Sequence, residues 1–267
     1  MATFSEAETR AMSPRDFRSL VRKGEYTDTT IGVSENYTQA NLAIVPKEYA
    51  FEFLLFCNRN PLHCPVLEVG EPGDPEPKQL ARGADLRTDL SRYRVYREGE
   101  VADEPTDITK YWRDDLIAFL LGCSQTFVWA LKAANIPFRR YGVYRTTVPS
   151  VAAGHFHGTM AVTVRAFYNA YDAVRAVQIS SRHRLMHGPP IHIGDPAEIG
   201  VELGQPDPFN PHRPAVELPK PGEVVMSWGC GVTAQTAAVE SKTPFMITHS
   251  PAHMFVTDRL IEELAIL

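Results

Sequence analysis

The sequence predicts an α/β fold with an α+β portion, in which a mixed sheet is flanked by helices and shared between two subdomains. Three observations lead to this prediction. Short strand-like apolar runs alternate with helix-like segments along the whole chain. With 267 residues, of which 44% are hydrophobic and 22% charged, the chain can bury a sizeable core without disulfides. Neither GxGxxG nor GxxxxGK(S/T) occurs, so no Rossmann dinucleotide motif and no cofactor are expected.

The N-terminal elements follow from caps, apolar periodicity and prolines. A serine N-cap followed by proline at the first helical position predicts a helix over 14–23. The apolar run 39–45 predicts a strand that leads into a helix over 46–58, whose aromatic residues share one face. Residues 65–69 are expected to form a second strand, and the three prolines of 71–77 predict a loop.

The middle of the chain continues this alternation. Polar and apolar residues alternate at 93–95, which predicts a strand before a turn at 98–100. Apolar residues recur at helical spacing in 109–121 and again in 124–134, with Gly122 between the two predicted helices. Strands are then expected at 139–147 and 159–165, and a helix at 169–180.

The C-terminal part contains a capped helix start and a proline-rich stretch. Asp195-Pro196-Ala197-Glu198 has the capping-box pattern with proline at the first position. Six prolines make residues 205–222 an extended linker or covering loop. The remaining expected elements are a strand at 223–228, a helix at 233–240, a strand at 245–248 and a helix at 258–264. We expect residues 1–145 and 222–267 to form the main α/β domain, and 146–221 a smaller α+β subdomain.

Composition excludes several classes of protein. The net charge of −5 and the absence of a basic tract argue against a nucleic-acid partner. The most apolar windows, 51–57 and 116–122, are far shorter than the roughly 20 residues of a membrane helix. No apolar leader follows the first residues, and the four cysteines form no CxxC pair, so we expect a cytoplasmic protein with reduced thiols. The sequence leaves homo-oligomer formation open.

A His-x-His pair, His155 and His157, lies in a glycine-rich segment. On a strand both rings would point the same way and could chelate zinc. No well-spaced third ligand accompanies them among the available residues, which are His187, His192, Asp195 and His249. We therefore expect no metal and assign His155 to substrate binding; a zinc-dependent lyase that uses both histidines is the alternative.

The segment 187–196 combines two glycines and three prolines with polar residues. His192 and Asp195 come just before the capped helix start, where backbone amides attract anions. This position suits a substrate carboxylate. In the alternative interpretation, Asp195 is only the N-cap and His192 only packs.

Two cysteines, Cys123 and Cys230, each occupy a small-residue turn ahead of a predicted helix. That position lowers a thiol pKa and can create a nucleophile or a proton carrier, and two facing thiols would form a racemase-like acid/base pair. In the alternative, both are small buried hydrophobic residues. His249 follows the strand 245–248, at a strand end where α/β sheets place ligands.

Arginines are the expected anchors for an anionic substrate, and Arg145, Arg165 and Arg87 are the candidates. We favour Arg145, which ends a predicted strand beside the glycine-rich segment, because a forked guanidinium binds carboxylates. A surface ion pair is the alternative role for Arg145.

Several segments together resemble the D-glutamate cyclase family, whose bacterial members are labelled hydro-lyases. These segments are residues 39–46, 67–77, 83–90, 122–124, 144–146, 187–196, 228–233 and 248–254. The resemblance implies a two-part α/β and α+β structure without an obvious cofactor, and cyclisation of D-glutamate to 5-oxo-D-proline with loss of water. The chain departs from the family pattern at 125–128, where Val128 replaces an acidic residue, and at Ser150, where the family often has cysteine.

Lactam formation requires a base, an oxyanion donor and an acid. The catalytic candidates are His187, His192, His249, Cys123 and Cys230, and the substrate-binding candidates are Arg145, Asp195 and His155. We expect Arg145, His187, His192, Cys230 and His249 to line one pocket, bordered by the loops 148–158 and 205–222. The leading interpretation is a cofactor-independent hydro-lyase or cyclase acting on a small amino or carboxylic acid. A non-catalytic protein that binds a small carboxylate is the alternative of a different class.

Overall fold

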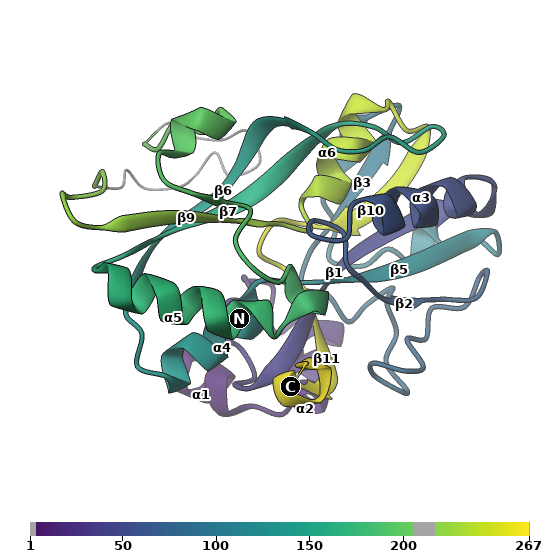
Figure 1. The fold of residues 1–267 in the computed structure, drawn as a ribbon. Helices are drawn as coiled ribbons and strands as arrows, with labels where there is room; N and C mark the ends of the chain where they lie inside the picture. The colour runs from purple at the N-terminus through teal and green to yellow at the C-terminus, as the bar shows by residue number, and fades with distance from the viewer. Residues whose placement is uncertain (1–3, 205–216, 267) are drawn as a thin grey trace.

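The computed structural model describes residues 4–204 and 217–266, and these form two antiparallel sheets flanked by helices (Figure 1). The larger sheet has the order β2-β5-β1-β10-β3-β4, with β11 also paired to β1, and the smaller has the order β6-β7-β9-β8. This α+β arrangement of two sheet-based subdomains agrees with the predicted fold class.

The strands of the larger sheet are β1 (Tyr37–Pro46), β2 (Val66–Val69), β3 (Tyr93–Arg97), β4 (Glu100–Asp103), β5 (Leu116–Gly122), β10 (Phe245–His249) and β11 (Phe255–Leu260). Those of the smaller sheet are β6 (Phe138–Pro149), β7 (Thr159–Phe167), β8 (His192–Ile193) and β9 (Val224–Gly229). The smaller sheet therefore draws its strands from residues 138–229, whereas the predicted smaller subdomain spans 146–221.

The α-helices of the described residues are α1 (Glu6–Ala11), α2 (Pro14–Arg22), α3 (Lys47–Arg59), α4 (Gln125–Ala133), α5 (Ala170–Ser181) and α6 (Thr233–Glu240). Helices α3 and α6 pack on one face of the larger sheet, and α4 and α5 pack on one face of the smaller sheet (Figure 1). Single 3₁₀ turns occur at η1 (Thr109–Tyr111), η2 (Arg184–Met186), η3 (Pro196–Ile199) and η4 (Ile261–Leu264).

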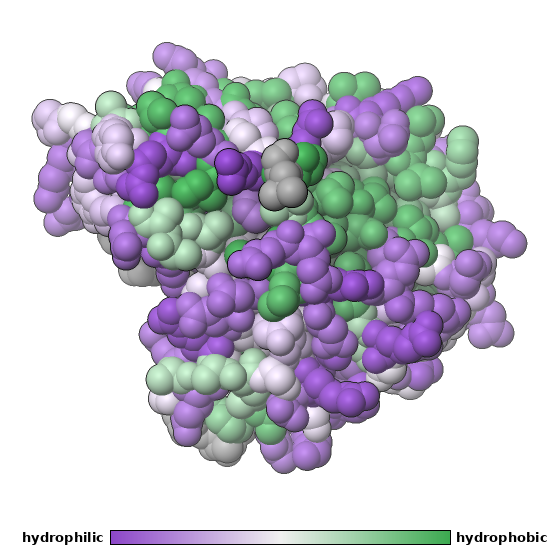
Figure 2. All heavy atoms as spheres, turned by 60° about the horizontal axis from the view of Figure 1, so that its bottom comes forward, coloured by the Kyte–Doolittle hydropathy of each residue, from purple (hydrophilic) through white to green (hydrophobic). Residues whose placement is uncertain are grey.

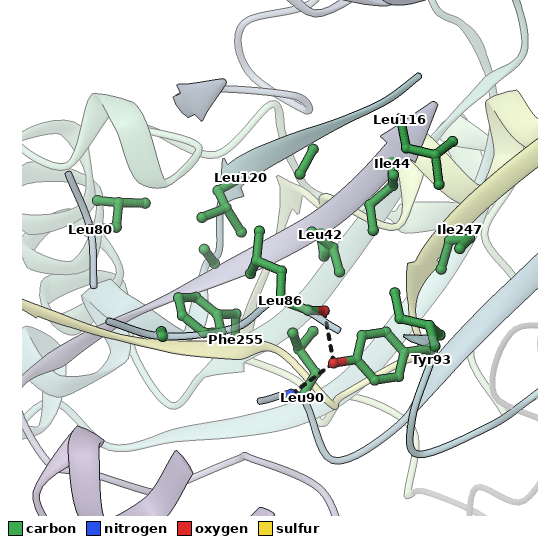
Figure 3. Packing of buried hydrophobic residues seen from close by; sticks show 14 of the residues in the cluster. Leu42, Ile44, Leu80, Leu86, Leu90, Tyr93, Leu116, Leu120, Ile247 and Phe255 are labelled. Carbon is green, nitrogen blue, oxygen red and sulfur yellow. Dashed lines mark hydrogen bonds between the residues drawn. The ribbon is translucent and has the colours of Figure 1, made fainter. Parts of the chain in front are cut away.

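Both faces of β1 are buried, which explains its nearly continuous apolar run. Leu42 and Ile44 face a core completed by the loop around Leu86, while Ala43 and Val45 face α3 and α6. In the first core the Tyr93 hydroxyl donates to the Leu86 carbonyl and accepts the Leu90 N–H, at 2.9 and 3.1 Å (Figure 3). These bonds satisfy a buried polar group and fix the loop over the sheet.

Most predicted elements are confirmed within a residue or two, but two predicted helices are wrong. Residues 109–121 form only η1 before β5, whose seven residues are almost all buried between β2 and β1. A short apolar run buried on both faces cannot be distinguished from a buried helix by periodicity. Residues 258–264 instead complete β11 and form η4. The proline-rich prediction at 205–222 falls largely on 205–216, outside the described residues.

Hydrophilic side chains cover much of the face shown in Figure 2, with hydrophobic ones gathered toward its upper right. Within residues 4–204 and 217–266, none of the helices has the length and hydropathy required to cross a bilayer.

The two sheets meet where Asn41 of β1 contacts two glycine-containing turns. The Asn41 side-chain amide donates to the carbonyl of Gly122, the residue before Cys123. A Cβ on Gly231, the residue after Cys230, would lie 2.1 Å from the same amide nitrogen. A Cβ on Gly122 would lie 1.7 Å from the Leu185 carbonyl oxygen. The absence of a side chain at Gly231 therefore permits the Cys230 turn to approach Asn41, and its absence at Gly122 permits the Leu185 backbone to approach the Cys123 turn.

Replacing Gly122 by alanine tests the close packing of the Leu185 backbone against the Cys123 turn. The added Cβ must displace the Leu185 backbone, so the free energy of unfolding should fall by about 1–3 kcal/mol, the usual range for overpacking a core. Urea unfolding measures the change. Gly70→Ala is the matched control, because its Cβ would meet nothing closer than 3.5 Å. Equal midpoints for Gly122→Ala and wild type would contradict the proposed constraint.

Candidate active site

A cavity of about 690 Å³ lies between the two sheets. Its wall combines residues of β1 and β3 from the larger sheet with residues of β6 and β7 from the smaller one. The turns that follow β5 and β9 supply Cys123 and Cys230, and the end of β10 supplies His249. Cys230 and His249 line this same cavity, as expected, although β9 and β10 belong to different sheets.

Two histidines in the cavity wall are held in opposite tautomers. The backbone N–H of Leu42 donates to Nδ1 of His249 at 3.2 Å, which places the ring proton on Nε2. The same Nδ1 also lies 3.4 Å from the Leu42 carbonyl oxygen, a contact that would need a proton on Nδ1. We assign the tautomer from the shorter bond, in which Nδ1 accepts the Leu42 N–H. Nδ1 of His253 lies 2.8 Å from the Pro251 carbonyl, which can only accept, so Nδ1 carries the proton and Nε2 keeps its lone pair.

Both imidazoles are neutral at neutral pH. Burial is the largest cause, and it lowers the pKa of His249 to about 4 and the pKa of His253 below its usual 6.5. His249 therefore carries its N–H on Nε2, a buried atom that has no hydrogen-bond partner among the described residues. His253 offers an unprotonated nitrogen, which is a base.

The cavity wall carries more positive than negative charge. Arg92, Arg94 and Arg140 line it, and Glu104 is the one carboxylate among the described lining residues. Glu104 is paired with Arg94, whose guanidinium also donates to Gln235 at 3.4 Å. Since Arg92 and Arg94 come from the larger sheet side and Arg140 from β6, cationic groups face the cavity from both sheets. This distribution suits a substrate with two anionic groups.

Two hydroxyls of the wall are backed by a buried guanidinium. Arg165 on β7 donates to Thr163 Oγ1 at 3.0 Å and to Ser124 Oγ at 3.2 Å. Ser124 and Thr163 line the cavity, and their oxygens lie 3.4 Å apart. Because both hydroxyls accept from Arg165 and one of them donates to the other, one hydroxyl hydrogen of the pair is available for an oxyanion in the cavity.

The cysteines differ from the reactive thiols expected from the sequence. Cys123 and Cys230 are buried, and burial is the largest cause that raises the pKa of Cys123 to about 12 and that of Cys230 to about 11. Backbone N–H groups and Arg140 act in the opposite direction but do not overcome the loss of hydration. The prediction of lowered thiol pKa values is therefore wrong, and the thiols remain protonated.

Slow alkylation is the expected consequence. At pH 8 a thiol with a pKa of about 11 is thiolate in only about one molecule in a thousand, so iodoacetamide should modify native Cys123 and Cys230 over hours rather than minutes. Mass spectrometry of time points measures this, with the urea-unfolded protein as the control in which all four thiols react. Complete labelling of either residue within minutes in the folded protein would contradict the assignment.

His187 lies outside the cavity wall. It follows η2, is fully buried with a left-handed φ of 78°, and its Nδ1 lies 2.9 Å from the Leu62 carbonyl. Burial lowers its pKa to about 4. The preceding Leu185 carbonyl is the group that packs against Gly122. His187 thus holds the segment that supports the Cys123 turn.

His192 and Asp195 are also remote from the wall. His192 Nε2 lies 2.9 Å from the Asp195 carbonyl, and the Asp195 side chain accepts the Ala197 N–H. The predicted helix start is confirmed as a cap, but η3 has only four residues. A single 3₁₀ turn offers few amides to an anion, so this segment is poorly suited to bind a carboxylate.

Arg145 and the His-x-His pair lie elsewhere on the surface. Arg145 is exposed on β6 and does not line the cavity. His155 packs on the Tyr49 ring at 5.1 Å, while His157 is exposed and is held through its backbone by Ser241. Within the described part of the chain, no group of three potential ligands is placed to hold a metal ion.

Sequence reasoning missed Arg92, Arg140 and His253 as parts of the site. His253 lies in the segment 248–254 that carries the family resemblance, and this could have marked it as a candidate. Its tautomer, however, depends on a hydrogen bond to the Pro251 carbonyl. Arg92 directly precedes β3 and Arg140 lies on β6, and the cavity that they share depends on how the two sheets meet.

Comparison with known proteins identifies the class of this chain. Residues 117–258 match the family model described as D-glutamate cyclase. A protein of Geobacillus kaustophilus is 49% identical and covers 96% of this chain and 98% of its own length. A protein of Stutzerimonas stutzeri is 45% identical, with 97% and 98% covered. Both relatives have names that begin "Putative hydro-lyase".

The chain belongs to the D-glutamate cyclase family. Among solved structures, a nitrogen repressor-like protein from Methanococcus jannaschii aligns over 92% of this chain and 98% of its own, at 10% identity and a TM-score of 0.39. That similarity is too low to inform fold or function.

Proposed function

We propose that this protein is a hydro-lyase that cyclises an acidic amino acid, with D-glutamate as the substrate that the family indicates. The single observation that carries the proposal is the pair of neutral histidines with opposite tautomers in a cavity rich in arginine. One ring can accept a proton and the other can donate a hydrogen bond, as dehydrative ring closure requires. The cytoplasmic location and independence of a cofactor remain part of this proposal.

The reaction can be assigned to the residues as follows. Arginines on both sides of the cavity hold the two carboxylates of the substrate, among them Arg92, which directly precedes β3 of the larger sheet. Nε2 of His253 takes a proton from the ammonium, and the freed nitrogen attacks the side-chain carboxyl carbon. One hydroxyl of the hydrogen-bonded pair Ser124 and Thr163 donates to the tetrahedral oxyanion.

Collapse of this intermediate forms the lactam and breaks one carbon–oxygen bond. The ammonium nitrogen loses two protons overall, and the departing oxygen gains two and leaves as water, so the reaction needs no other reactant. His253 carries both protons in turn from the nitrogen to the departing oxygen, while the Nε2–H of His249 donates a hydrogen bond to that oxygen. The buried thiols of Cys123 and Cys230 remain neutral and shape the wall without acting as nucleophiles.

Replacing His253 by glutamine tests the assigned base. Turnover of D-glutamate to 5-oxo-D-proline, followed by chiral chromatography, should fall by about 10²–10⁴-fold in kcat, the usual contribution of a general base. His157→Gln is the matched control, because His157 is exposed outside the cavity. Normal turnover by His253→Gln would exclude this residue as the base, and wild-type protein without turnover would favour a carboxylate-binding role.

The pH dependence provides a separate test. Because burial lowers the pKa of His253 below 6.5, the base is unprotonated at neutral pH and becomes protonated as the pH falls. We expect kcat/KM to rise with pH through a value below 6.5 and then to level off. Loss of this acidic limb in His253→Gln would support the assignment. An unchanged limb in that variant would assign it to another group.

A further inference from the structure

A second cavity of about 210 Å³ adjoins the first. The two share Ile31, Gln125 and Arg140 in their walls. Arg165 and Lys132 also line the second cavity, and no Asp or Glu occurs among its described lining residues. Lys132 helps to lower the pKa of Glu35, but Glu35 is paired with Arg10 and lies outside this wall. The described residues of the second cavity's wall are therefore cationic and include no carboxylate.

Arg165 is the residue that requires an explanation. Its side chain is 0% exposed, and it makes no ion pair within residues 4–204 and 217–266. Its two terminal nitrogens donate to Thr163 and Ser124, but Nε has no partner. A buried charge without a counter-charge is destabilising by several kcal/mol.

The aromatic rings around Arg165 reduce the destabilisation caused by its buried charge, but they do not neutralise that charge. The guanidinium lies 5.1 Å from the Phe127 ring centroid and 5.2 Å from that of Trp228, within the range of cation–π attraction. Burial lowers its pKa only to about 9, so the side chain stays protonated at neutral pH. The neighbouring thiols supply no negative charge, because their own pKa values are raised.

We propose that the second cavity is a binding subsite for an oxyanion, a carboxylate or a phosphate, held by Arg165 and Lys132 beside Arg140. The anion supplies the counter-charge that the wall lacks, and the free Nε–H of Arg165 is a donor directed to no other described group. Because Arg140 and Gln125 line both cavities, the subsite can hold an anionic group of a ligand larger than glutamate or a separate small anion. This assignment does not depend on the proposed function.

Isothermal titration of the full chain with inorganic phosphate, and separately with acetate, tests the subsite at constant ionic strength. We expect saturable binding of at least one anion, and the preferred one distinguishes a phosphate from a carboxylate ligand. Val128 lines the second cavity, so Val128→Glu would place a carboxylate beside Arg165 and should weaken the binding at least tenfold.

Two variants that change the net charge by the same single unit serve as controls. Val151 is exposed outside both cavities, so Val151→Glu should leave the affinity within about twofold. Arg92 lines only the first cavity, so Arg92→Met shows whether the measured anion binds there instead. If circular dichroism shows that Val128→Glu does not fold, Lys132→Met is used instead. Lys132 is exposed, so this variant should fold normally. With either variant, a loss of affinity absent from both controls supports the subsite.

Three results would overturn the proposal. These are the absence of saturable binding of both anions to wild type, equal affinity of the cavity variant and wild type, and an equal loss in Arg92→Met, which would place the anion in the first cavity. Turnover of D-glutamate is measured on the same samples. Turnover without anion binding rejects the subsite alone, whereas anion binding without turnover rejects the proposed function alone.

Discussion

The cavity depends on one close packing contact, that of the Asn41 side chain with the turns at Gly122 and Gly231. Asn41 belongs to the central strand of the larger sheet, and Gly231 follows the last residue of β9 in the smaller sheet by two positions. A side chain on Gly231 would overlap the Asn41 amide, and one on Gly122 would overlap the Leu185 carbonyl. Because these turns carry Cys123 and Cys230, the same packing positions the part of the cavity wall that the two cysteines form.

Burial then determines the charge of each group around that space. Loss of hydration keeps the thiols and the histidines neutral, since it raises the pKa of Cys123 and lowers that of His249. Guanidinium groups resist deprotonation, and even the fully buried Arg165 keeps its proton at neutral pH. The result is a cationic cavity with neutral proton donors and acceptors, which suits proton transfer on an anionic substrate.

Local signals predicted most of the secondary structure because caps, prolines and apolar periodicity are local. The Ser13 cap of α2 and the Asn169 start of α5 required only neighbouring residues. The strand β5 could not be predicted from local signals, because burial on both faces removes the alternation that identifies a strand. The terminal strand β11 was also missed, since its pairing with β1 joins residues more than 200 positions apart.

The candidate site could be predicted only where chemistry coincided with a distinctive motif. The cysteine turns and His249 were found in this way, and all three line the cavity. Glycine-rich and proline-rich motifs also marked His187 and Asp195, but these residues hydrogen-bond backbone groups near them and maintain local structure. Nothing in the sequence places Arg140 opposite Arg92, because that relation arises from the meeting of two sheets.

The central claim is that His249 and His253 face one cavity as neutral rings with opposite tautomers. Two-bond nitrogen–proton correlation NMR on protein with ¹⁵N-labelled histidine measures this directly at pH 7. The structure predicts that His249 carries its proton on Nε2 and His253 on Nδ1, with assignments made from His249→Gln and His253→Gln spectra. The same tautomer at both positions, or a doubly protonated ring at either one, would contradict the claim.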